Sequence, residues 1–194
     1  MSKQEFTPDQ LKFKKKNQRV LLIVAAVFLL PLLAAKLVLS MGWYESGVSN
    51  KGNLVQPEIQ FTEAANAALP AKWRIAYSMP EHCEEACLNS LYVAGQLFHA
   101  LGRQQERVLP VAIAGVGSAQ ELPELQADSM VTLVYAPEAQ EMLVTIPEHA
   151  LMIIDPVGNV VLWYPGSEDR RDVVMQGRDL LSDLQKLLKL SRVG

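Results

Sequence analysis

The feature that most constrains this chain is an apolar run near its beginning, Val20 to Met41, in which Lys36 is the single charge. As a helix these 22 residues would span about 33 Å, enough to cross the hydrocarbon core of a bilayer. Trp43 and Tyr44 follow the run, and such aromatic side chains favour the membrane interface. The run therefore predicts one transmembrane segment over residues 20–41.

A cleaved signal peptide is the alternative interpretation, because it also has a basic segment before an apolar run. This run is longer than the apolar region of most signal peptides, and no A-x-A cleavage site follows it. We therefore expect an anchor that stays attached to the protein.

Charge is divided unevenly along the chain, although the formal net charge is only -3. Residues 1–19 carry six basic and two acidic side chains, whereas residues 52–194 carry ten basic and eighteen acidic ones. By the positive-inside rule the basic tail stays in the cytoplasm and the domain is exported, which in a bacterium means a single-pass inner-membrane protein with a periplasmic domain. An acidic domain also argues against nucleic acid as a partner, since phosphates attract cationic surfaces.

Beyond the anchor we expect a tether over residues 42–70 and one folded domain over residues 71–194. The tether is predicted because Gly, Ser, Asn and Pro are frequent there and apolar runs are few. In the domain, hydrophobic periodicity predicts the order strand, helix, strand, link, hairpin, helix. The expected strands lie within 72–79, 107–115, 130–136, 141–146, 150–155 and 155–164, a part-helical link covers 118–129, and the helices cover 83–101 and the segment after a cap at Ser167. Helices flanking a mixed sheet predict an α/β, thioredoxin-like domain.

The two cysteines of the chain, Cys83 and Cys87, lie where the first predicted strand leads into the first predicted helix. Their spacing would put both sulfurs on one helix face. Free N–H groups at a helix start stabilise a thiolate, whereas Glu81, Glu84 and Glu85 disfavour it and would instead help to hold a cation. Three interpretations stay open: a redox pair, part of a Cu(I) site, and a structural disulfide.

A metal site would need a third ligand, and the chain has three histidines. His82 adjoins Cys83 and is expected to point away, and His99 lies near the end of the predicted helix. His149 precedes an apolar strand that a thioredoxin-like fold brings beside the cysteines, so His149 is the candidate metal ligand. Motifs of hydrolytic enzymes are missing from the sequence, so any enzymatic activity would be thiol–disulfide oxidoreduction.

The anchor, "WRIAYSMPEHCEEAC", "DPVGNVVLWY" and the closing "LLSDLQKLLKLS" together resemble the membrane-anchored thioredoxin-fold proteins related to the Sco copper chaperones. More closely, they resemble small transmembrane proteins that accompany cytochrome c oxidase assembly factors in proteobacteria. The resemblance covers roughly residues 50 to 192. It implies that Cys83 and Cys87 are copper and redox thiols, with a histidine before the D-P-x-G turn as third ligand.

Two residues compete for the place that the resemblance gives to this histidine. Pro147 stands eight positions before the aspartate of the turn, and His149 follows two positions later on the same predicted strand face. Alternatively, Pro147 would serve as the substrate-binding cis-proline of thioredoxins.

These observations predict a membrane-anchored periplasmic protein that assists cytochrome c oxidase assembly by copper handling or by thiol–disulfide exchange through the C-x-x-x-C pair. Oxidase subunits or assembly factors would be its partners. The alternatives are a general periplasmic thiol–disulfide oxidoreductase and a non-catalytic assembly factor whose cysteines form a structural disulfide.

Overall fold

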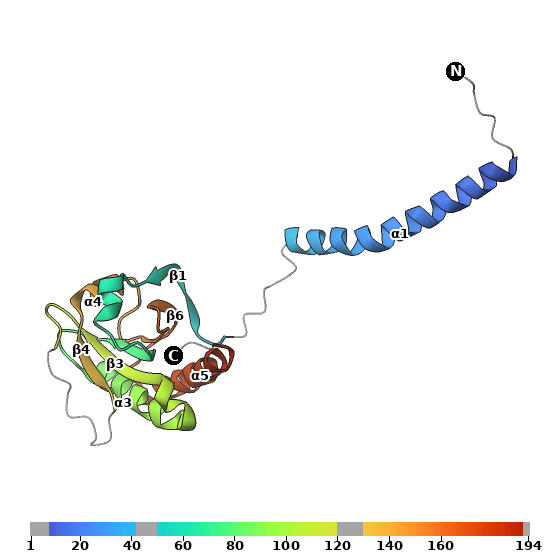
Figure 1. The fold of residues 1–194 in the computed structure, drawn as a ribbon. Coiled ribbons are helices and arrows are strands. Elements are labelled where there is room, and N and C mark those ends of the chain that lie inside the picture. The colour runs from blue at the N-terminus through green and yellow to red at the C-terminus, as the bar shows by residue number, and fades with distance from the viewer. Residues whose placement is uncertain (1–7, 42–49, 120–129, 192–194) are drawn as a thin grey trace. The chain divides into compact units, whose positions relative to one another are not determined.

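A computed structural model of the protein describes residues 8–41, 50–119 and 130–191. The chain divides into two units, Met1–Ser49 and Asn50–Gly194, and each is described by itself. The elements, in chain order, are α1 (Pro8–Ser40), β1 (Asn53–Gln60), α2 (Glu63–Ala67), β2 (Trp73–Ser78), α3 (Glu85–Ala100), the 3-10 helix η1 (Gly102–Arg107), β3 (Val108–Ala114), β4 (Thr132–Tyr135), α4 (Pro137–Met142), β5 (Leu151–Ile154), β6 (Asn159–Tyr164) and α5 (Arg170–Leu190) (Figure 1).

The first unit contains the predicted apolar segment as part of the 33-residue helix α1. Within the described residues, one helix is long and apolar enough to cross a membrane: Val20–Leu37 has a mean hydropathy of 2.7, and none of it is buried in the protein. Length and composition of α1 therefore suit a membrane anchor.

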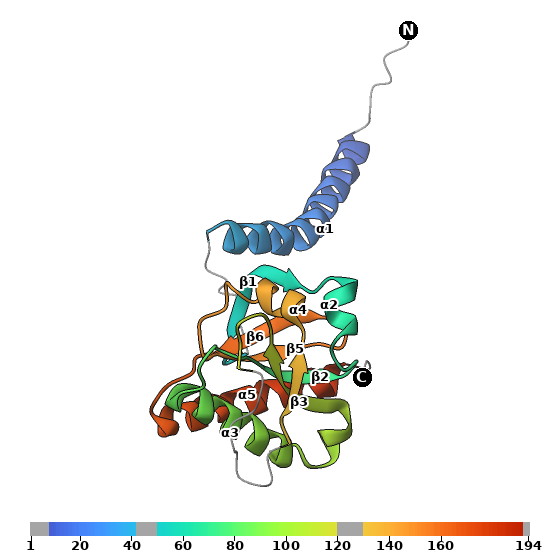
Figure 2. The same cartoon turned by 90° about the vertical axis from the view of Figure 1, so that its left-hand side faces the viewer.

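The second unit is built on a six-stranded sheet in the order β1-β6-β5-β2-β3-β4. The pairs β2–β3 and β3–β4 are parallel, and the other neighbours are antiparallel. Helices α3 and α5 cover one face of the sheet, and α2 and α4 lie on the other (Figure 2). The mixed sheet with flanking helices confirms the predicted thioredoxin-like fold.

Strand β2 occupies the centre of this sheet and is buried on both faces. Ile75 and Tyr77 pack in the core under α3 and α5, whereas Ala76 packs in the core on the opposite face. This follows from the strand geometry, in which successive side chains point to opposite faces. Because β2 ends at Ser78 and α3 begins at Glu85, the cysteines lie at the carboxyl end of a central strand.

The closing helix α5 buries an apolar stripe against the same face as α3. Leu180, Leu184 and Leu188, which follow one another at intervals of four residues, are each at most 1% exposed. Gly177 lets the two helices approach, since a Cβ there would overlap Val93 of α3. The helix is therefore a part of the core.

A buried carboxylate fastens α5 to the beginning of β1. Asp183 is 2% exposed and accepts hydrogen bonds from the backbone N–H groups of Lys51 (2.6 Å) and Gly52 (3.0 Å) and from the Tyr164 hydroxyl (3.0 Å). The Lys186 ammonium is 3.1 Å away. Burial alone raises the pKa of Asp183, but these four donors outweigh it and hold the pKa below its ordinary value.

The extent of the predicted tether, residues 42–70, is wrong, because β1 and α2 lie within it and β1 pairs with β6. The sequence signal of β1 is weak for a physical reason. It is an edge strand in which only Val55 and Ile59 are buried, and Pro57 and an irregular register interrupt the ladder.

The strand predicted over residues 141–146 is also wrong, since α4 runs to Met142 and a turn follows. Pro137 at the first helical position with Glu138 after it is a typical helix start, and this signal outweighs the short apolar run. The cap of α5 is Asp169, which accepts from the N–H of Arg171 at 2.8 Å, rather than Ser167. Most of the predicted link 118–129 lies outside the described residues.

Candidate functional site

The loop from β2 to α3 carries Cys83 and is held by hydrogen bonds from neighbouring elements. The Met79 N–H donates to the Ile113 carbonyl at 2.9 Å. The Met79 carbonyl accepts from Gln140 Nε2 at 2.7 Å and from the Ser118 hydroxyl at 3.0 Å. The Pro80 carbonyl accepts from the Ala119 N–H at 2.9 Å. These bonds from β3, α4 and the loop after β3 fix the approach to Cys83.

Cys83 and Cys87 form a disulfide with their Cα atoms 5.2 Å apart. The prediction that both lie on one helix face is wrong in one respect: α3 begins at Glu85, so Cys83 precedes the helix and Cys87 lies in its first turn. Cys83 is half-buried, whereas Cys87 is 0% exposed. The two sulfurs therefore differ in access to a partner.

The first turn of α3 has a polar, negatively charged border. Glu84 is the N-terminal cap residue, and its side chain makes no capping hydrogen bond. Glu81, Glu84 and Glu85 are all exposed. The helix start stabilises a thiolate, while the three carboxylates oppose it, as the sequence predicts.

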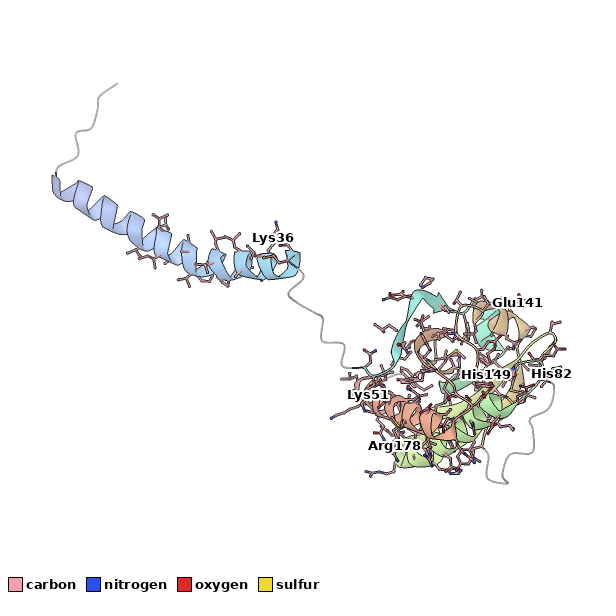
Figure 3. The ribbon with its side chains drawn as sticks, turned by 180° about the vertical axis from the view of Figure 1, so that it is seen from behind. Lys36, Lys51, His82, Glu141, His149 and Arg178 are labelled. Carbon is pink, nitrogen blue, oxygen red and sulfur yellow. A yellow bond between two sulfur atoms is a disulfide. The ribbon has the colours of Figure 1, made fainter. Side chains whose placement is uncertain are left out.

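Two of the three histidines are exposed on the surface of the domain. The His82 side chain is 81% exposed and lies 4.0 Å from a Glu81 carboxylate oxygen. His99 is exposed in the last turn of α3, with its ring 6.0 Å from that of Phe98. Figure 3 shows His82 at the periphery of the domain and His149 further in.

His149 is held by contacts from three directions. Its Nδ1 lies 3.0 Å from the hydroxyl of Tyr77, which is completely buried. Its carbonyl accepts from the Ser90 hydroxyl at 2.9 Å, and Ser90 lies one turn after Cys87 in α3. Gly166 packs so closely that a Cβ there would overlap the His149 backbone. The structure thus ties His149 to the helix that the cysteine pair opens.

The backbone of His149 has φ = 61°, in the left-handed region that non-glycine residues rarely adopt. This conformation costs roughly 1–2 kcal/mol for a residue with a Cβ. Residues held in this way cluster at functional sites, because the surrounding contacts must impose the conformation.

Burial, and to a smaller extent the negative charge of Glu148, raises the pKa of Tyr77. The phenol is protonated at neutral pH, as a tyrosine ordinarily is, and its O–H can donate to Nδ1 of His149. In the neutral imidazole that bond leaves the proton on Nε2.

An open cleft of about 470 Å³ adjoins His149. It lies between the loop after β2, α4 and the segment that leads into β5. Its lining includes Ser78, Met79, Pro80, Gln140, Glu141, Leu143, Val144, Ile146, Pro147, Glu148, His149, Ala150 and Met152. The alternative role for Pro147 is not supported: among the described residues the cis peptide bond is Gln56–Pro57, so Ile146–Pro147 is trans.

The fit of a copper ion depends on the redox state of the pair. In the disulfide form neither sulfur is a thiolate, and among residues 8–41, 50–119 and 130–191 no three His, Cys, Asp or Glu side chains gather as a metal site. On reduction the donors would be two sulfurs and an imidazole, the chemistry that Cu(I) prefers. The oxidised site therefore does not fit copper, whereas reduction would supply two thiolates of the kind that Cu(I) prefers.

Sequence reasoning missed three side chains. Tyr77 and Ser90 bond to His149, and Gln140 bonds to the loop before Cys83. Tyr77 lies in an apolar strand where nothing distinguishes it from a core residue. Ser90, three positions after Cys87, carries a detectable signal, because a polar side chain on the face of a cysteine in an apolar helix needs a hydrogen-bond partner.

The family described as "Transmembrane-like, thioredoxin-like, C-terminal domain" matches residues 73–191, which is more than half of the chain. No curated protein matches the sequence.

Solved structures with a similar arrangement include copper-bound ScoI of Bradyrhizobium japonicum (15% identity, 68% of this chain and 98% of that chain, TM-score 0.41). Apo Sco1 of Thermus thermophilus shares 16% identity over 71% of this chain and 96% of that chain, with a TM-score of 0.47. The thioredoxin domain of a Bacteroides vulgatus thiol-disulfide oxidoreductase shares 11% identity over 70% of this chain and 96% of that chain, with a TM-score of 0.38. Likeness at this level assigns no activity.

Proposed function

The chain belongs to the family of transmembrane-like, thioredoxin-like C-terminal domains, and from this premise we propose that it is a membrane-anchored thiol–disulfide exchange protein that serves cytochrome c oxidase assembly. The observation that carries the proposal is the Cys83–Cys87 disulfide at the end of the central strand, with one sulfur half-buried and the other completely buried. The oxidase pathway comes from the sequence resemblance alone.

The unequal burial assigns different roles to the two sulfurs. A partner thiolate attacks the Cys83 sulfur, a bond forms between these two sulfurs, the Cys83–Cys87 bond breaks, and Cys87 leaves as a thiolate. A second partner thiolate then attacks the partner sulfur of the mixed disulfide and releases Cys83. The partner dithiol is oxidised to a disulfide, and the pair is reduced to two thiols. The reverse sequence reduces a partner disulfide.

This proposal is tested by equilibrating the full-length chain with glutathione buffers of graded potential and counting alkylated cysteines. We expect both cysteines to pass together between the oxidised and reduced forms within the buffered range. A pair that stays oxidised at every potential would be a structural disulfide, and the non-catalytic alternative would then hold. Exchange with many unrelated dithiols would instead favour a general oxidoreductase.

Copper handling is a second candidate, favoured by the attachment of His149 to Tyr77 and Ser90 beside the helix of the pair. The reduced sulfurs of Cys83 and Cys87 with His149 Nε2 would hold Cu(I). For Nε2 to bind a metal, the neutral ring must carry its proton on Nδ1 and donate it to the Tyr77 oxygen.

A competition titration against a Cu(I) chelator under strict reduction tests copper handling. We expect the unaltered chain to compete, either Cys→Ser change to abolish tight binding, and His149→Ala to weaken it about 10 to 100 fold. If the unaltered chain does not compete while its disulfide still equilibrates with glutathione, thiol exchange alone remains.

The domain would work in the periplasm of a bacterium, with α1 in the inner membrane. The support is the basic tail before Val20, which favours the cytoplasmic side. A reporter enzyme fused after Gly194 should then be active only if it works outside the cytoplasm. Activity of a cytoplasmic reporter in that position would contradict the orientation.

A further inference from the structure

Helix α5 presents to solvent a stripe of side chains that alternate in spacing between four and three residues. The stripe consists of Arg171, Met175, Arg178, Ser182, Gln185 and Lys189. Residues with this spacing lie on one face of a helix. All of them except half-buried Ser182 are exposed, and the apolar Met175 side chain is 61% exposed. Figure 3 shows Arg178 on this helix.

The stripe is cationic, although the exported part of the chain is acidic. It contains three basic side chains and no acidic one. The acidic side chains of α5, Asp172, Asp179 and Asp183, lie on a neighbouring face that is shifted by one residue. Of these, Asp179 pairs with Lys51 at 2.6 Å and Asp183 with Lys186 at 3.1 Å. The structure records no ion pair for Arg171 or Arg178 among the described residues.

One further basic side chain, that of Arg170, lies beside the stripe at the start of α5. The Arg170 guanidinium lies 3.8 Å from the centre of the Tyr92 ring of α3 and is exposed. An open hollow next to it is lined by Arg170, Arg171, Val174, Met175, Arg178 and the capping residue Asp169. The single carboxylate there, Asp169, accepts from the Arg171 N–H, so it is engaged as a helix cap.

The shape of this surface favours an extended anionic partner over a small ion. Arg171 and Lys189 are 18 residues apart, which corresponds to about 27 Å along the helix. Cations spread along a helix with an exposed apolar side chain between them are typical of surfaces that lie against anionic headgroups.

If α1 is a membrane anchor, the short connection limits how far the domain can move from that membrane. Nine residues, 41–49, connect the end of α1 at Ser40 with Asn50, and nine extended residues reach at most about 32 Å. If α1 is the anchor, the domain is confined to a thin layer, in which a weak surface attraction is strongly enhanced. We propose that the α5 stripe binds the anionic phospholipid headgroups of the membrane that α1 spans. This inference does not depend on the thiol chemistry.

The test uses the full chain with Met175→Trp, reconstituted in nanodiscs of brominated phosphatidylcholine with or without phosphatidylglycerol. Bromine quenches tryptophan fluorescence at short range, and the unaltered chain gives the background from Trp43, Trp73 and Trp163. We expect additional quenching only with phosphatidylglycerol, and its loss at high salt. A melting curve for each variant shows that the domain is folded.

Two single charge reversals distinguish an effect of the stripe from an effect of the net charge of the protein. Arg178→Glu should weaken the phosphatidylglycerol-dependent contact by at least roughly fivefold, the effect expected for one basic residue at an anionic surface. Lys72→Glu changes the net charge by the same amount in an exposed position before β2 and should leave the contact unchanged. The proposal would be overturned if quenching were the same with and without phosphatidylglycerol, or if both variants had equal effects. It would also be overturned if Met175→Trp gave no additional quenching, and an acidic protein surface would then be the partner to test.

Discussion

Two buried tyrosines occupy equivalent places in the sheet, and their partners differ in kind. Leu151 of β5 pairs with Tyr77 of β2 on one side and with Tyr164 of β6 on the other. Both tyrosines are 0% exposed and belong to the core under α3 and α5. The Tyr164 hydroxyl donates to the carboxylate of Asp183, whereas the Tyr77 hydroxyl bonds to the imidazole of His149.

The comparison distinguishes a structural contact, at Asp183, from a candidate functional site, at His149. Asp183 is buried and receives four donors, so that α5, β6 and the beginning of β1 are joined by one satisfied charge. His149 is half-buried, has φ = 61°, and borders an open cleft. Strained residues cluster at functional sites, which makes His149 a candidate for such a role. We therefore expect changes at Asp183 to reduce stability and changes at His149 to alter chemistry.

The largest expected effect is on stability, from the loss of the hydrogen bonds that Asp183 accepts. Asp183→Ala would leave the Tyr164 hydroxyl and two backbone N–H groups without their acceptor, and should lower the free energy of unfolding by about 3 kcal/mol or more. Thermal or urea unfolding of the full chain measures it. Asp179→Ala is the control, because it removes only the exposed pair with Lys51 and should cost less than about 1 kcal/mol. Equal losses in both variants would contradict the assignment.

The two tyrosines themselves give the sharpest matched pair. Tyr164→Phe removes a hydrogen bond to the Asp183 carboxylate and should cost about 2 kcal/mol, whereas Tyr77→Phe removes one to the His149 imidazole and should cost about 1 kcal/mol. Unfolding curves give these values, and glutathione equilibration gives the redox midpoint of the pair. Only Tyr77→Phe should shift that midpoint. If Tyr164→Phe shifted the redox midpoint by the same amount, the two tyrosines would not differ in their link to the cysteine pair.

A smaller effect separates the backbone of His149 from its side chain. His149→Gly and His149→Ala both remove the imidazole, but glycine adopts φ = 61° without the steric cost of a Cβ. The glycine variant should be more stable than the alanine variant by about 1 kcal/mol, measured by unfolding. Equal stabilities would mean that the position carries no strain.

The smallest effect is a pH dependence at Asp183. Its folded-state pKa lies below the unfolded value, so its stabilising contribution is present above about pH 4 and is lost as pH falls through the folded pKa. The stability difference between the unaltered chain and Asp183→Asn should stay constant from about pH 7 to 5 and shrink at lower pH. A difference that already shrinks near pH 6 would assign the effect to another group.

Strong local patterns made much of the fold predictable. The continuous apolar run of β2, the regularly spaced leucines of α5 and the Pro–Gly turn before β6 are strong local signals, and the structure has a strand, a helix and a turn there. The edge strand β1 was not predicted, because one half-exposed face and an internal Pro57 leave little periodicity. The strength of the local sequence pattern, more than whether the element is a helix or a strand, decided whether it could be predicted.

The candidate site was predictable only in part. The position of Cys83 and Cys87 after a strand is a local property of the sequence. The attachment of His149 to Tyr77 and Ser90 is not, since these residues are separated from His149 by 72 and 59 positions. The pairing of β2 with β5 brings Tyr77 close, and the packing of α3 on the sheet brings Ser90 close.

The most direct test of the account is whether the two cysteines react unequally with a partner thiol. In Cys87→Ser the half-buried Cys83 keeps its sulfur without the resolving thiol, so the full-length reduced chain should accumulate a mixed disulfide when challenged with an oxidised peptide or with glutathione disulfide. Cys83→Ser leaves the buried Cys87, which should form little or none. Non-reducing gels and mass spectrometry quantify both adducts. A mixed disulfide in Cys87→Ser at least about tenfold more abundant than in Cys83→Ser supports exchange through Cys83. Equal trapping in both variants, or none in either, would contradict it.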